Sequence, residues 1–160
     1  MSDEYELEAL LEIRQRELDE AERQVARAQR ILASAEESLR EQQAHLRSQR
    51  QERHRSEEAF SSEMASGQLS SGEVQAFGRY RQRLMAQEEA LERDVHEAKD
   101  ALQQAQSEVE KRRAQMREAI RQLKAVEGHR EKWEARRQQA AMRKAGRQMD
   151  EVASRIWRGG

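Results

Sequence analysis

The residues of this sequence that could do chemistry are its histidines and its carboxylates. The chain has four histidines, His45, His54, His96 and His129, and 31 aspartate and glutamate residues. No two histidines are four residues apart, which is the spacing that places a metal-binding pair on one face of a helix. Cysteine is absent, and no glycine-rich phosphate loop is present. The sequence therefore predicts no metal site and no cofactor.

The carboxylates are spread along the chain, and no pair of them stands out as a catalytic acid and base. We expect them on exposed faces of helices, where no pocket raises the pKa of a carboxyl group. The histidines are expected to be ordinary solvated side chains. A protein built only from long helices offers no concave site that excludes water, so we predict no catalytic residues and no enzymatic activity.

The element that must position these side chains is a long helix with a seven-residue repeat. Large apolar residues recur at Leu11, Leu18, Val25, Leu32, Leu39 and Leu46, and alanine fills three of the other seam positions, at Ala21, Ala28 and Ala35. Such a repeat is typical of a helix in a left-handed supercoil with a partner helix. The next seam positions carry Arg53 and Phe60, so we expect weaker apolar packing there.

A second long helix follows a break that is rich in serine and glycine, between Ser61 and Gly72. One heptad row runs through Phe77, Leu84, Leu91, Ala98, Ala105, Arg112, Ala119, Val126 and Trp133, and another runs through Val95, Leu102, Val109, Met116 and Leu123. Asp3 with Glu6 and Ser70 with Glu73 have the spacing of helix N-terminal capping boxes. We predict helix one over about residues 3–64, a turn over about 65–71 and helix two over about 72–157, in one domain spanning 1–160.

Two long helices joined by a short turn form an antiparallel hairpin, so the predicted fold class is an all-α coiled-coil hairpin. Folding at the turn brings Leu39 near Ala98 and Leu11 near Val126. Charge supports this pairing: residues 3–22 hold nine acidic and two basic residues, whereas residues 111–147 hold thirteen basic and four acidic residues. A parallel dimer would instead place the acidic ends together.

Helix two is the longer one, so residues 134–157 are expected to project as a C-terminal helical overhang. Its basic residues and its terminal Ile156 and Trp157 indicate a docking surface. Near the turn, Phe77, Leu84 and Leu91 are expected to pack against Phe60 and Met64, whereas Tyr80 lies off the main seam and is a candidate for an exposed contact.

Composition excludes several classes of protein. Aromatic residues make up 4% of the chain and charged residues 38%, which suits a narrow helical seam rather than a broad core. The net charge of −1 and the lack of aromatic stacking platforms speak against a nucleic-acid binder. The N-terminus does not have the pattern of a signal peptide, and no apolar run is long enough to span a membrane. A cytoplasmic location is expected.

Three segments of the sequence resemble the type III secretion stalk proteins of the YscO and FliJ family. They are Leu10-Leu11-Glu12-Ile13-Arg14 with Glu17 and Ala21; Gly72-Glu73-Val74 with Phe77, Tyr80 and Leu84; and Trp133-Glu134-Ala135-Arg136-Arg137 followed by Met149-Asp150-Glu151-Val152-Ala153. The resemblance covers nearly the whole chain, and it includes the length and the two-helix layout.

The resemblance implies a central stalk whose paired termini enter the hole of a hexameric export ATPase. It assigns ATPase contacts to Arg136, Arg137, Arg143, Lys144, Arg147, Asp150 and Glu151. It also implies contacts with the export-gate protein through Tyr80, Leu84 and Leu91, although the polar residue Gln87 lies on the same face. Some members of the family bind export chaperones as well, and no residue of this sequence points to that contact.

Two other readings of the sequence stay open. A structural coiled-coil scaffold or spacer would self-associate through the overhang and would not bind a ring. A helical-hairpin nucleic-acid binder would show binding through the basic overhang that weakens steeply with salt.

Overall fold

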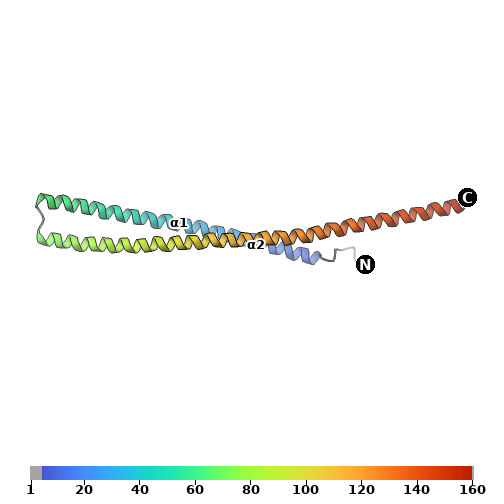
Figure 1. Cartoon of the computed structure of the whole chain (residues 1–160), viewed down its shortest axis with the longest axis horizontal. Coiled ribbons are helices and arrows are strands. Elements are labelled where there is room, and N and C mark those ends of the chain that lie inside the picture. Colours follow the sequence, from blue (N-terminus) through green and yellow to red (C-terminus); the bar gives the residue numbers. More distant parts are fainter. Residues whose placement is uncertain (1–4, 160) are drawn as a thin grey trace. The chain divides into compact units, whose positions relative to one another are not determined.

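The computed structural model describes residues 5–159, which form two helices, α1 (Glu8–Ser66) and α2 (Ser71–Gly159) (Figure 1). The helices pack against each other as an antiparallel hairpin, and the predicted all-α fold is confirmed. The chain divides into two compact units, each held together by its own internal contacts. The end unit comprises Met1–Gln24 and Arg113–Gly160, and the tip unit comprises Val25–Arg112. Each unit contains one segment of α1 and one of α2.

The start of α1 differs from the prediction, since the helix begins at Glu8 rather than near residue 3. A turn precedes it, in which the amide of Glu8 donates to the carbonyl oxygen of Tyr5 at 3.1 Å. Asp3, the predicted capping residue, lies outside the described residues. Tyr5 is 5% exposed because its ring packs against Trp133 of α2. This tertiary contact replaces the additional turn that was predicted at the start of α1.

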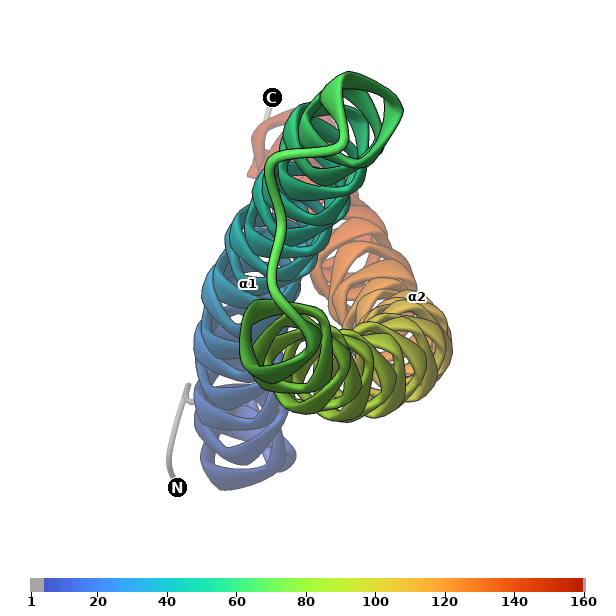
Figure 2. The same ribbon diagram turned by 90° about the vertical axis from the view of Figure 1, so that its left-hand side faces the viewer.

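The connection between the helices is short, as predicted, and Figure 2 shows it joining the two helix ends directly. Gly67 has a φ of 72°, a left-handed conformation that L-residues with a side chain rarely adopt. Ser70 caps α2 with its hydroxyl oxygen, which accepts from the amide of Glu73 at 3.2 Å. The predicted cap at Ser70 is therefore confirmed on the serine side.

The heptad seam forms the core of both units. The buried apolar residues are Val25, Ala28, Leu46, Leu84, Val95, Ala98, Ala105 and Val109 in the tip unit, and Tyr5, Leu123 and Val126 in the end unit. All except Tyr5 lie at predicted seam positions. Near the turn, the rings of Phe60 and Phe77 stack with their centroids 3.9 Å apart, whereas Met64 stays 50% exposed.

The register of the hairpin can be read from the ion pairs that cross it. Arg50 pairs with Glu88 and Arg81 with Glu57 in the tip unit, and Arg130 pairs with Glu8 in the end unit. The two residue numbers of each pair have the same sum, as an antiparallel pair of helices requires. The predicted neighbours Leu39 and Ala98, and Leu11 and Val126, match this register to within one residue.

Charged side chains replace apolar ones where the leucine repeat ends. Arg53 occupies a seam position of α1, and its Nε donates to Oε2 of Glu88 at 2.6 Å. The Nε of Arg50 donates to the other oxygen of the same carboxylate at 3.3 Å. The hydrogen bond from Arg53, followed by that from Arg50, holds the pKa of Glu88 below its usual value although burial acts in the opposite direction. We call Arg50, Arg53 and Glu88 the Glu88 cluster.

Candidate partner-binding surfaces

The C-terminal part of α2, residues 134–159, is the most exposed segment of the hairpin, and we call it the tail. Every residue of the tail is exposed, as the predicted overhang requires. In Figure 1 it is the red end of α2, which continues past the start of α1. The tail is therefore a helix whose whole circumference is open to a partner.

The predicted ATPase-contact residues share one face of the tail. They are Arg136, Arg137, Arg143, Lys144, Arg147, Asp150 and Glu151, which form three adjacent pairs repeated every seven residues, with Arg147 three or four residues from the last two pairs. Because a helix turns about 100° per residue, these separations keep the side chains on one side. We call this side the charged face. Five of its seven residues are basic, so it suits a partner with carboxylates.

The base of the tail is held to the N-terminal segment by an aromatic cluster in the end unit. The ring of Tyr5 lies 5.3 Å from that of Trp133 between centroids, and its hydroxyl is hydrogen-bonded to Nδ1 of His129. The guanidinium group of Arg137 lies over the other ring, 5.4 Å from the centroid of Trp133. Burial raises the pKa of Tyr5 above its ordinary value. This cluster ties the first described residues to the start of the tail.

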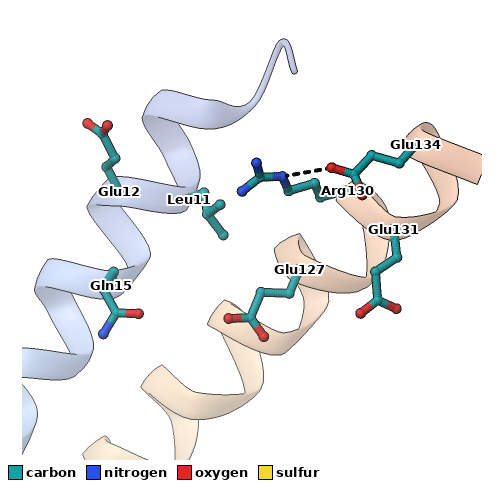
Figure 3. A pocket seen from close by; sticks show the side chains of 7 residues that line it. All are labelled: Leu11, Glu12, Gln15, Glu127, Arg130, Glu131 and Glu134. Carbon is teal, nitrogen blue, oxygen red and sulfur yellow. Dashed lines mark ion pairs between the residues drawn. The ribbon is translucent and has the colours of Figure 1, made fainter. Parts of the chain in front are cut away.

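Next to this cluster, a groove of about 400 Å³ lies between the first turns of α1 and the facing part of α2 (Figure 3). Its lining residues are Leu11, Glu12 and Gln15 from α1, and Glu127, Arg130, Glu131 and Glu134 from α2. Arg130 reaches Glu134 at 3.5 Å and Glu8 at 3.6 Å. The four glutamates that line the groove are exposed, so their carboxylates face solvent.

No group of three metal-binding side chains comes together anywhere in residues 5–159. His54 and His96 each lie beside a carboxylate on their own helix, Glu58 and Asp100, and all four side chains are well exposed. Neither of the two described helices carries an apolar segment long enough to cross a membrane.

The second surface, near the turn, is less exposed than the partner contact implied by the family resemblance would suggest. Leu84 is 6% exposed because it lies in the seam, and Leu91 and Tyr80 are half-buried. The ring of Tyr80 lies 6.4 Å from that of Phe77, and the guanidinium group of Arg83 lies 5.8 Å from its centroid. Gln87 is hydrogen-bonded to Gln49 across the hairpin. Of the three predicted contact residues, Tyr80 and Leu91 are partly exposed, whereas Leu84 lies in the core.

Sequence reasoning missed the Glu88 cluster and the aromatic cluster. Seven residues before Val95 stands Glu88, so continuing that heptad row toward the turn would have placed a carboxylate opposite Arg53. His129 is exposed, as predicted, but its ring is also hydrogen-bonded to the hydroxyl of Tyr5. If the hairpin register had been extended to the first residues of the chain, it would have predicted that Tyr5 lies beside Trp133.

The family model described as YscO-like protein matches residues 2–158. A solved structure described as that of a candidate YscO homolog, CT670 from Chlamydia trachomatis, superposes with a TM-score of 0.82. The two sequences are 20% identical, and the match covers 97% of this chain and 95% of CT670. No curated protein has a significantly matching sequence. At this identity, the structural match establishes a shared fold.

Proposed function

Because the chain belongs to the YscO-like family of type III secretion proteins, we propose that it is the central stalk of the secretion apparatus. In this role it has no enzymatic activity of its own. Its end unit enters the hole of a hexameric export ATPase, and its tip unit reaches the export-gate protein. The stalk works in the cytoplasm, beside the apparatus at the inner membrane. By contacting one subunit of the ring at a time, it links ATP hydrolysis to protein export.

The observation that carries this proposal is the tail, which is helical and exposed all round through residues 134–159. A ring that closes around a helix needs such a segment. Its contacts are assigned to the charged face, where Arg136, Arg137, Arg143, Lys144 and Arg147 attract carboxylates, and Asp150 and Glu151 attract basic residues. The aromatic cluster gives the tail a rigid base, since the bond between Tyr5 and His129 holds the segment before α1 to α2 just ahead of the tail.

We assign the export-gate contact to the surface around Tyr80. Its ring is half-buried and is held by Phe77 and Arg83, so it offers a rigid edge to a partner. Leu84 and Leu91 keep α2 against α1 beneath this edge and act as positioning residues. Tyr80→Ala should weaken binding of the purified export-gate protein, whereas the exposed neighbour Gln82→Ala should leave the dissociation constant unchanged. Equal binding of both variants would contradict this assignment.

Deleting residues 134–160 tests the ATPase assignment. The truncated hairpin should retain its helical circular dichroism, because its seam is complete, but should no longer stimulate hydrolysis by the cognate ATPase. A milder test neutralises the charged face with R143Q, K144Q and R147Q together. Its matched control neutralises three exposed basic residues elsewhere on α2, with R79Q, R93Q and K99Q.

The ATPase stimulation of these variants distinguishes a stalk from a scaffold. Loss of stimulation on truncation and on neutralising the charged face, with the control unchanged, supports the stalk. Full stimulation by the truncated hairpin contradicts it and favours a coiled-coil scaffold without ATPase coupling.

A further inference from the structure

The tail carries a second, apolar surface that the proposed ATPase contacts do not use. Ala145, Met149, Val152, Ala153 and Ile156 line one depression with Gln148, and Met142 lies one turn before them. Met142, Met149 and Ile156 are 72%, 74% and 72% exposed. We call Met142, Ala145, Met149, Val152 and Ile156 the apolar stripe. Contiguous exposed apolar side chains of this kind mark an interaction surface.

The apolar stripe lies opposite the charged face. Met149 is two residues from both Arg147 and Glu151, and two residues turn a helix by about 200°. Steps of three and four residues, from Met142 to Ala145, Met149, Val152 and Ile156, keep the stripe on its own side. The tail is thus an amphipathic helix, with apolar side chains on one side and mainly basic ones on the other.

The stripe is not an unused remainder of the hairpin seam. Steps of seven residues from the seam residues Val126 and Trp133 lead to Ala140 and Arg147, and neither lines the apolar depression. A longer α1 in the same register would therefore cover a different side of the tail. The described residues of α1 therefore do not supply an occupant for the stripe.

A second copy of the chain would cover too little surface. The stripe offers five residues, whereas a standard protein interface uses about 20–30 residues on each side. A partner that encloses the tail on both sides contacts residues 134–159, which matches that size. Charge supports the same choice, because a wall that carries carboxylates complements the mainly basic charged face on the other side of the tail.

We propose that the tail is bound in a protein socket with two unlike walls, apolar side chains against the stripe and carboxylates against the charged face. This inference rests on the proposed function, in which the socket is the hole of the ATPase ring, and it adds a second contact surface. It also fixes the rotational orientation of the tail, since each face of the helix fits only one wall.

The absence of cysteine allows the two faces to be labelled one at a time. M149C places a fluorophore on the apolar stripe, and S154C places one on the charged side without removing a proposed contact residue. Quenching by iodide is measured for each labelled full-length chain, alone and with the cognate ATPase hexamer. Enclosure predicts that both labels lose accessibility, at least severalfold. Protection of the S154C label alone overturns the inference.

Substitution provides the second measurement. M149Q with V152Q keeps the helix and removes the apolar side chains, and it should raise the dissociation constant of the ATPase about tenfold at both low and high salt. M149L with V152I keeps the stripe apolar and should bind normally. R143Q with R147Q should weaken binding at low salt and lose this effect as salt increases, because salt screens charges.

These results separate the inference from the proposed function. Unchanged binding of M149Q with V152Q, when deletion of residues 134–160 abolishes binding, overturns the apolar contact and leaves the stalk intact. Unchanged binding of the deleted chain overturns both. Sedimentation of the wild-type chain as a dimer that M149Q with V152Q makes monomeric, with ATPase binding unchanged, would assign the stripe to a second copy and overturn the inference.

Discussion

Arg53 and Glu88 meet across the hairpin in the tip unit, where Nε of the arginine donates to Oε2 of the glutamate at 2.6 Å. Both residues occupy heptad positions that apolar side chains hold elsewhere, and the glutamate side chain is only 11% exposed. A buried carboxylate is favourable only if it is paired and hydrogen-bonded. The Glu88 cluster therefore stabilises one register of the two helices relative to registers shifted along the seam. Apolar layers alone distinguish less strongly between such registers.

Removal of Glu88 should destabilise the hairpin. Glu88→Ala takes away the carboxylate and leaves the guanidinium of Arg53 in the seam, so we expect a loss of about 1–2 kcal/mol in the free energy of unfolding. Urea unfolding followed by circular dichroism measures this loss. Glu92→Ala is the matched control, because Glu92 is 49% exposed and also pairs with Arg50, and its effect should stay within about 0.5 kcal/mol. Equal effects of the two variants would show that the Glu88 cluster contributes no more to the free energy of unfolding than an exposed ion pair.

Acid should weaken the hairpin through the same cluster. The pKa values of Glu88 and Glu57 are lowered in the folded chain, chiefly by hydrogen bonds from Arg53 and Arg81 respectively. Their stabilising effect is complete above the ordinary carboxyl pKa of about 4.3 and is lost as the pH falls through the lower folded-state values. The free energy of unfolding should thus stay level from neutral pH to about pH 5 and then decrease. Glu88→Gln should decrease less steeply in the same titration, and an identical slope would contradict this assignment.

Gly67 should stabilise the turn through its backbone conformation rather than through its small size. With a φ of 72°, an alanine at this position would adopt a left-handed conformation at a cost of about 1 kcal/mol, although no neighbouring atom would clash with its Cβ. Gly78→Ala is the control, because Gly78 lies inside α2 with open space around it, and this change should stabilise the helix by about 0.5–1 kcal/mol. Opposite shifts in melting temperature are expected, and shifts of the same sign would refute the role of φ.

Tyr5 should shield Trp133 from water. Trp157→Phe leaves Trp133 as the single tryptophan, so its fluorescence reports on the aromatic cluster alone. In this background Tyr5→Ala should shift the emission to longer wavelength, because it removes the ring that lies 5.3 Å away. Tyr5→Phe keeps the ring and loses only the bond to His129, so its shift should be smaller. Emission that does not respond to Tyr5→Ala would show that the N-terminal segment does not hold the base of the tail in solution.

Much of the fold could be predicted because a heptad repeat is a local property of one helix. The leucines from Leu11 to Leu46, the lack of proline and the break before Ser71 determine two long helices and a turn. The opposite charges of the two chain ends then favour the antiparallel register. The charged tail could be predicted in the same way, since it is the part of helix two for which helix one has no counterpart.

Tertiary structure decided what the residues between the leucines do. Arg53 looked like a weak point of the seam, and only the register that brings Glu88 opposite to it makes it a hydrogen-bonded part of the core. Tyr5 leaves the predicted helix because Trp133 and His129, far along the chain, give its ring a better environment. These outcomes depend on pairs of residues from different helices, and such pairs exist only once the chain has folded.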